Sequence, residues 1–127
     1  VGRRRRNERY AFFQEMRAEG QVGAMGIALT ANRSLAVDPA VVPFGAPVWI
    51  DTSSPGPRIA VQGPPLRRLM VAQDTGGAIR GPVRGDVFFG FGDEAASLAG
   101  RMKSPGAWYV LMPRAAADRV VLTSRAR

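Results

Sequence analysis

Short apolar runs separated by glycine and proline constrain the fold of this chain more than any other feature. The 127 residues include 15 Gly and 10 Pro, which repeatedly interrupt segments of β-type residues. This spacing of short strands and turns is typical of a small β-barrel or sandwich. We predict strands over Ser34–Val37, Pro47–Ile50, Arg58–Val61, Leu69–Gln73, Asp86–Phe91 and Ala107–Met112. A chain of this length suits one domain, burying roughly two thirds of its unfolded surface.

Two further segments carry helical signals. Asp93 is predicted to be the N-cap of a helix, with Glu94 in the first turn and Arg101 near the C-terminal end. Asn7–Glu19 also fits a capped helix, but Tyr10–Phe13 within it is equally good strand material, so both readings stay open.

The chain contains neither cysteine nor histidine. Disulfides and thiolate metal sites are therefore excluded, as are Ser-His-Asp and Cys-His nucleophiles and His-ligated zinc. The remaining proton-transfer groups are carboxylates, amines and hydroxyls. We expect neither a metal nor a cofactor.

Positive charge is concentrated at the two ends of the chain. The formal net charge is +8, with arginines crowded at Arg3–Arg6 and again near the C-terminus. Such runs are most often solvated tails, and otherwise bind anionic polymers such as nucleic acid or acidic cell-wall strands. There is no apolar stretch of 18 residues and no signal-peptide pattern.

Two acids at the ends of apolar segments are the strongest candidates for chemistry. Asp74 follows the run Leu69–Gln73 and precedes two glycines, and Asp86 follows a glycine turn and begins an apolar run. Because both lie at strand ends beside tight turns, we expect the two carboxylates to share one cleft. Apolar surroundings and a second carboxylate both favour a protonated carboxyl. Such a group serves as the general acid that cleaves a glycosidic or peptide bond.

A turn-capping role is the simpler explanation for any single strand-end aspartate. It suits Asp51 and Asp93 best. Asp38 is a third acid at a strand end, and Pro39 keeps its backbone extended. The sequence Asp74-Thr75-Gly76 also resembles the aspartic-protease triplet, although no later segment matches the rest of that fold.

Aromatic residues leave a second set of alternatives open. Trp49, Trp108 and Tyr109 could stack on sugar rings, but strand aromatics more often belong to the core or its edge. The residues are thus compatible with a carbohydrate-cleaving enzyme. They are also compatible with an aspartic-type peptidase, a non-catalytic wall-binding module or a basic nucleic-acid binder.

Six ordered sequence blocks together resemble the C-terminal three-aspartate domain of the membrane-bound lytic murein transglycosylase A family. They are Gly23–Thr30, Arg33–Pro39, Pro43–Trp49, Gln73–Ile79, Arg84–Asp86 and Gly90–Ala96. The resemblance extends from about Tyr10 to Pro113. It divides the chain into a basic tail (1–9), the domain (10–113) and a C-terminal segment (114–127).

This resemblance implies a fold and an activity. The fold is a mainly β, double-psi β-barrel with one or two short peripheral helices. The activity is a non-hydrolytic cleavage of the MurNAc–GlcNAc β-1,4 bond of peptidoglycan, which makes the protein a carbohydrate lyase producing 1,6-anhydro-MurNAc ends. By position, Asp86 matches the catalytic acid and Asp74 its neighbouring carboxylate. Thr75, Gly76, Gly77, Ala78 and Asp38 are assigned to substrate binding, although the Pro-flanked setting of Asp38 looks structural.

The resemblance also implies partners and a location. Family members act on peptidoglycan glycan strands, and we expect a monomer that does not bind nucleic acid. They lie in the periplasm, attached to the outer membrane by a lipid anchor of the full-length protein. They also carry an upstream segment and an inserted second barrel domain that forms the other wall of the groove, which we expect to lie outside these 127 residues.

Overall fold

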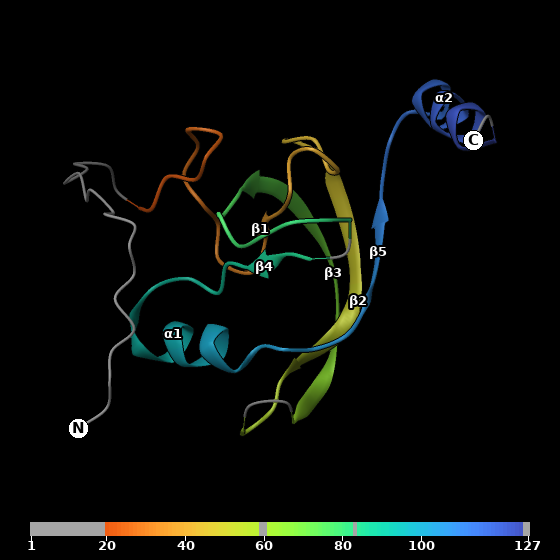
Figure 1. Cartoon of the computed structure of the whole chain (residues 1–127). Coiled ribbons are helices and arrows are strands. Elements are labelled where there is room, and N and C mark those ends of the chain that lie inside the picture. Colours follow the sequence, from red (N-terminus) through yellow and green to blue (C-terminus); the bar gives the residue numbers. More distant parts are fainter. Residues whose placement is uncertain (1–19, 59–60, 83, 126–127) are drawn as a thin grey trace.

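A computed structural model describes residues 20–58, 61–82 and 84–125 of the chain (Figure 1). The basic tail and the ambiguous segment Asn7–Glu19 lie outside these residues. The described part is mainly β with two short helices, as predicted. In chain order the elements are β1 Ser34–Ala36, β2 Pro47–Pro55, β3 Gln62–Asp74, β4 Asp86–Val87, α1 Gly92–Arg101, β5 Ala107–Val110 and α2 Arg114–Arg125.

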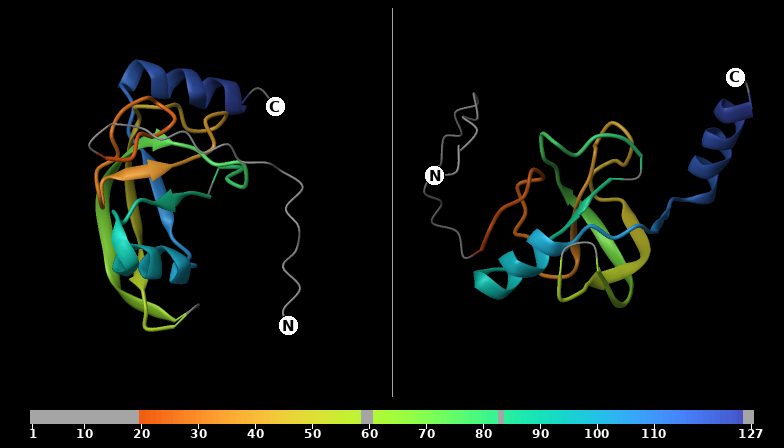
Figure 2. Two further views of the ribbon diagram at one scale, coloured as in Figure 1. Left: turned by 90° about the vertical axis from the view of Figure 1, so that its left-hand side faces the viewer. Right: turned by 60° about the horizontal axis from the view of Figure 1, so that its bottom comes forward.

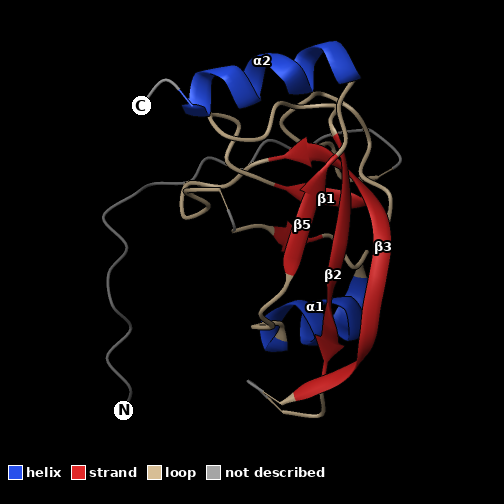
Figure 3. Cartoon of the chain, turned by 90° about the vertical axis from the view of Figure 1, so that its right-hand side faces the viewer, coloured by secondary structure: helices blue, strands red, loops and turns tan. Residues whose placement is uncertain are grey.

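The five strands form one sheet in the order β4-β1-β3-β2-β5. The antiparallel β2–β3 hairpin is its longest part, and β5 adds to the outer side of β2 (Figure 3). The β1–β3 pair is parallel, whereas β1 and β4 are antiparallel. Because β4 and β5 are both edge strands in the described residues, the sheet is open there. The resemblance implies a closed double-psi barrel, but among the described residues no ladder of hydrogen bonds joins the two edges of the sheet.

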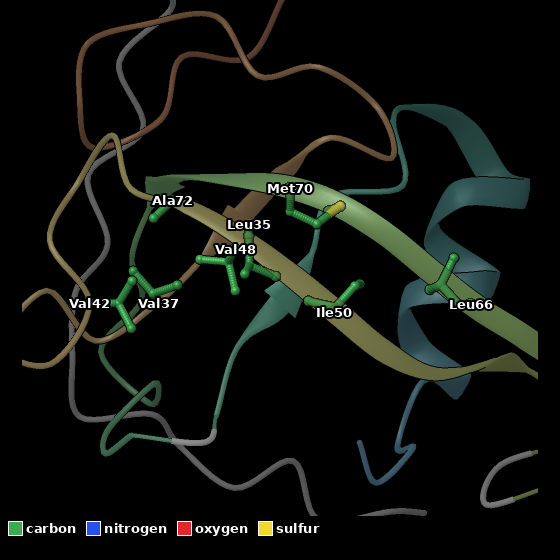
Figure 4. Packing of buried hydrophobic residues seen from close by; sticks show 8 residues of the cluster. All are labelled: Leu35, Val37, Val42, Val48, Ile50, Leu66, Met70 and Ala72. Atoms are coloured by element: carbon green, nitrogen blue, oxygen red, sulfur yellow. The ribbon is translucent and has the colours of Figure 1, made fainter. Parts of the chain in front are cut away.

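Alternation along β2 and β3 places one face of the sheet in the core. Val48 and Ile50 of β2 are buried beside Met70 of β3, while Trp49 between them is exposed on the other face. The complete cluster of buried residues, drawn in Figure 4, is Leu35, Val37, Val42, Val48, Ile50, Leu66, Met70 and Ala72. Burying each large aliphatic side chain contributes roughly 1.5–3 kcal/mol. Helix α1 lies beside Leu66 and covers this end of the core (Figure 4).

The predicted strand over Arg58–Val61 is wrong for the two of its residues that the structure describes, because neither Arg58 nor Val61 is in a strand. The β2–β3 ladder continues to the pair Pro55–Gln62, so Arg58 lies in the turn that reverses the chain. The Gly56 N–H donates to the Val61 carbonyl at 2.8 Å and closes that turn. The composition of this segment is typical of a strand, but the segment connects β2 to β3 and therefore has to reverse the direction of the chain.

The predicted limits around α1 also need correction. The strand expected over Asp86–Phe91 is only Asp86–Val87, because Gly90 and Gly92 take φ values of +109° and +88°, which an extended strand does not contain. The helix has Phe91 as its N-cap, without a side-chain hydrogen bond. Asp93 lies in the first turn instead, where its carboxylate still complements the helix dipole.

Helix α2 projects beyond the end of β5, and Figure 2 shows it apart from the core of the sheet. The sequence analysis assigned no structure to this C-terminal segment. Among the described residues, neither helix has the length and apolar character that a membrane crossing requires.

Candidate active site

The three candidate aspartates lie around the end of β1. Ala36 of β1 is in register with Asp74 on β3 at one side and with Asp86 on β4 at the other. Two neighbouring strand spacings put their Cα atoms about 9–10 Å apart. The side chains of both acids line one small hollow of about 210 Å³. The fold therefore brings together the two carboxylates that the sequence analysis expected to share a cleft.

Asp86 is the exposed member of this pair. It belongs to the two-residue edge strand β4, which leaves one side of its backbone and side chain open. No hydrogen bond or ion pair joins its carboxylate to any other residue that the structure describes. The apolar surroundings expected from the sequence do not enclose it, because β4 is too short to be covered on both sides.

Asp74 is half-buried and held in one orientation. Its Oδ1 accepts a hydrogen bond of 2.9 Å from the N–H of Ala24, in the loop before β1. That loop lies directly on the end of β3, since a Cβ added to Gly23 would be 2.6 Å from the Gln73 carbonyl oxygen. Glycine at position 23 is therefore required for the close approach that places the Ala24 N–H against Asp74.

Asp38 has a structural environment. It is buried, with Oδ2 accepting a 2.8 Å hydrogen bond from the Gly81 N–H and Oδ1 a 3.1 Å bond from the Ala40 N–H. Arg80 lies 4.0 Å from Oδ1. The two backbone N–H groups, Gly81 first, and then Arg80 lower the pKa of Asp38, and its burial opposes them.

Asp38 lines neither of the two hollows around Asp86, so its assignment to substrate binding is not favoured by its position. It instead ties the end of β1 to the turn at Gly81. Of the predicted loop residues, Thr75 and Gly76 line the small hollow with the two acids. Gly77 and Ala78 are exposed next to them and lie outside it.

A larger hollow of about 920 Å³ opens on the other side of β4. It lies between the two edges of the sheet, with Ile50 and Trp108 among its apolar lining residues. Trp108 of β5 packs against Gly85, whose missing side chain leaves room for the indole ring. Asp86 lines both hollows and so stands on the rim that separates them.

The aromatic residues have different roles. Trp108 is half-buried against the core and also lines the larger hollow. It therefore fits both sequence-based alternatives, a residue at the edge of the core and an aromatic surface for sugar rings. Trp49 and Tyr109 are register partners on the opposite face, 39% and 56% exposed.

Arg84 and Lys103 line the larger hollow as well, and the sequence analysis did not identify them as site residues. Only the place of Arg84 two residues before Asp86 could have indicated it.

Residues 33–112 match the 3D domain family, and this range covers the three aspartates, the whole lining of the larger hollow and all five strands. The chain belongs to the 3D domain family. Relatives with this 3D domain include membrane-bound lytic murein transglycosylase A of Escherichia coli (strain K12), which is 31% identical over 114 residues, or 90% of this chain and 31% of the relative. The chain thus spans less than a third of the length of the curated relatives it matches.

Solved structures with this 3D domain have the same fold. The lytic transglycosylase LtgG of Burkholderia pseudomallei is 47% identical with a TM-score of 0.71, over 83% of this chain and 30% of that chain. Escherichia coli MltA with bound chitohexaose is 31% identical with a TM-score of 0.60, over 73% of this chain and 28% of that one.

Proposed function

We propose that this 3D domain is the catalytic domain of a lytic murein transglycosylase, which cleaves the MurNAc–GlcNAc β-1,4 bond of peptidoglycan without water. The observation that carries the proposal is the setting of Asp86, an exposed carboxylate without a protein partner in the described residues, on the rim between two hollows. The names of the relatives support the same activity, and they do not favour an aspartic-type peptidase.

Asp86 is the general acid and then the general base. Its carboxyl proton moves to the glycosidic oxygen as the bond from that oxygen to C1 of MurNAc breaks. The C6 hydroxyl of the same sugar then attacks C1, and its proton returns to the Asp86 carboxylate. The products are a 1,6-anhydro-MurNAc end and a free GlcNAc hydroxyl, and the acid is regenerated without consuming water.

Asp74 stabilises the positive charge that develops at C1. Its half-buried carboxylate borders the same hollow as Asp86, and the Ala24 N–H fixes its orientation. A carboxylate held in advance near a developing oxocarbenium ion gains interaction energy only as the charge appears, which lowers the barrier.

Saccharide units bind on both sides of the Asp86 rim. Thr75 and Gly76 line one side, with Gly77 and Ala78 exposed next to them, and Trp108 offers an aromatic surface on the other. We further infer that the two sheet edges belong to a double-psi barrel, which the packing of Trp108 on Gly85 supports. The protein would act as a monomer on murein in the periplasm, with a lipid anchor in the full-length protein holding it at the outer membrane.

Mass spectrometry of murein digests tests the proposal. We expect anhydro-MurNAc ends from the chain, or from a chimera in which it replaces the matching segment of the Escherichia coli relative. Asp86→Asn keeps the size of the side chain but removes the transferable proton, so turnover should fall by roughly 10²–10⁴-fold. Asp74→Asn should cost less, because it removes a charge that stabilises C1 but leaves the transferable proton of Asp86 in place.

Asp93→Asn is the matched control, since Asp93 is equally exposed but lines neither hollow. Reducing ends would indicate a hydrolase, and cut stem peptides a peptidase. An Asp86→Asn variant with normal turnover would rule out its assignment as the acid.

A further inference from the structure

The larger hollow beside Asp86 has an excess of positive charge. Its charged lining residues are Arg84, Lys103 and Asp86. Neither cation forms an ion pair or hydrogen bond with another residue in the described part of the chain. When Asp86 carries the proton needed for catalysis, the two cations are the only charges among the described residues that line this hollow.

Backbone contacts place the segments that carry both cations beside the hollow. Arg84 precedes Gly85, whose Cα lies against the Trp108 ring and whose added Cβ would be 2.7 Å from the Ala36 carbonyl oxygen. Position 85 therefore cannot accept a side chain unless β1 or β5 moves. The backbone of Arg84 consequently lies next to the paired residues Ala36 and Asp86.

The loop that carries Lys103 is also anchored. The Thr52 hydroxyl of β2 donates to the Pro105 carbonyl at 2.8 Å. Gly106 approaches β2 closely, since a Cβ there would be 2.7 Å from the Asp51 carbonyl oxygen. At its other end the Met102 N–H caps α1 through the carbonyls of Leu98 and Ala99. Lys103 is thus held between two fixed points at the hollow.

We propose that Arg84 and Lys103 form a carboxylate-binding subsite in the larger hollow, which selects glycans with an acidic group close to the bond being cut. The proposal rests on the proposed function and names the substrate feature that this side of the site recognises. Two basic side chains facing one hollow attract an anion by charge and by charge-assisted hydrogen bonds. Their exposure limits each contribution to the range of a surface ion pair.

Murein offers carboxylates from two sources. In a strand without peptides, each MurNAc has a free lactyl carboxylate. In a strand with peptides the lactyl group is an amide, and the carboxylates belong to the stem. Chitohexaose, which is bound in a structure of Escherichia coli MltA, has neither, so it separates recognition of charge from recognition of sugar.

Binding measurements on the chain test the subsite independently of turnover. All variants carry Asp86→Asn so that no probe is consumed. The probes are peptide-free murein strands, the same strands as lactyl methyl esters, peptide-bearing strands and chitohexaose. We expect Arg84→Gln and Lys103→Gln each to weaken binding of a carboxylate-bearing probe about threefold, and the double variant about tenfold. Binding of the methyl esters and chitohexaose should not change.

Arg114→Gln is the matched control, because Arg114 is exposed on α2 and lines neither hollow. A loss confined to peptide-free strands identifies the lactyl carboxylate, and a loss confined to peptide-bearing strands identifies the stem. Equal losses for carboxylates and methyl esters would overturn the proposal, as would an equal effect of Arg114→Gln. Absence of anhydro ends with wild-type protein would instead refute the proposed function and leave these binding differences interpretable.

Discussion

Hydrogen bonding separates the three aspartates at the scale of single residues. Asp38 accepts two backbone N–H groups, Asp74 accepts one, and Asp86 has no partner in the described residues. A carboxylate that accepts several N–H bonds holds its negative charge and resists protonation, whereas an unpaired one can exchange a proton with a ligand. This gradient supports a structural role for Asp38 and a proton-transfer role for Asp86.

Asp38 should make the stability of the domain depend on pH. Gly81 N–H and then Ala40 N–H lower its pKa in the folded state, so the folded protein binds the proton less well than the unfolded chain, whose Asp pKa is about 3.9. The stabilisation is complete above the unfolded pKa and is lost as pH falls through the folded pKa. Thermal unfolding measured from pH 6 downwards should show this decrease.

Asp38→Asn is the corresponding variant. It should unfold at a lower temperature near neutral pH, because an amide forms weaker bonds to Gly81 and Ala40 than a carboxylate does. Its stability should change less between pH 6 and 3 than that of the wild type. Parallel curves for the two proteins would show that the bonded carboxylate does not cause the acid sensitivity.

Gly85→Ala should disturb the contact that brings the two sheet edges together. The new methyl group would overlap the Trp108 ring and lie 2.7 Å from the Ala36 carbonyl oxygen, and neither neighbour is the end of a flexible side chain. Overpacking of this kind costs about 1–3 kcal/mol. Gly100→Ala is the control, because a Cβ there has no neighbour within 4 Å. Denaturant unfolding of both variants should show the difference, and equal stability would contradict the packing argument.

At the scale of elements, the sequence predicted those parts that depend on local pattern. The β-type run Pro47–Ile50 located the start of β2, and the run Leu69–Gln73 located the end of β3 to within one residue. The turn at Arg58 could not be found this way, because the pairing of Pro55 with Gln62 across the hairpin decides where the chain reverses. For the site, strand ends beside glycine turns located both acids.

The cationic side of the site depends on contacts between elements that are distant in sequence. Lys103 follows α1 and reaches the hollow only because Thr52 and Gly106 dock its loop on β2. No local pattern around Lys103 contains that information.

Thr52→Val should loosen this loop. The substitution retains the shape of the side chain and removes the 2.8 Å hydrogen bond to the Pro105 carbonyl, a loss of about 0.5–1.5 kcal/mol. Thr52→Ser keeps the hydroxyl and should restore most of the stability. Hydrogen exchange of the amides of Lys103, Ser104 and Gly106, together with denaturant unfolding, is the measurement. If the valine and serine variants are equally protected, this hydrogen bond does not anchor the loop.

At the scale of the whole molecule, the curl of the sheet creates the site. Its two edges face each other across the larger hollow, joined by Trp108 on Gly85, and β4 stands as a rim with the smaller hollow behind it. Asp86 therefore borders both hollows, while Leu35 and Ile50 of the buried cluster form part of the apolar lining of the larger one. A long polymer can cross such a rim without entering a closed cavity.

The overall charge should act on binding through a separate, long-range effect. Arg3–Arg6 supply four positive charges, half of the formal net charge of +8, and they lie outside the described residues. Deleting residues 1–6 should weaken binding to murein carboxylates at low salt, where the Debye length is about 30 Å at 0.01 M, and have little effect at 1 M, where it is about 3 Å. Co-sedimentation with murein across a salt series measures this. A loss that persists at 1 M salt would mean direct contacts by the tail, and loss of sequence-selective binding to DNA or RNA would favour the nucleic-acid alternative.

The Arg84→Gln and Lys103→Gln variants supply the comparison, because each removes one charge that lines the larger hollow. Their effect should depend on the lactyl or stem carboxylate of the probe, whereas that of the tail should depend only on salt and total charge.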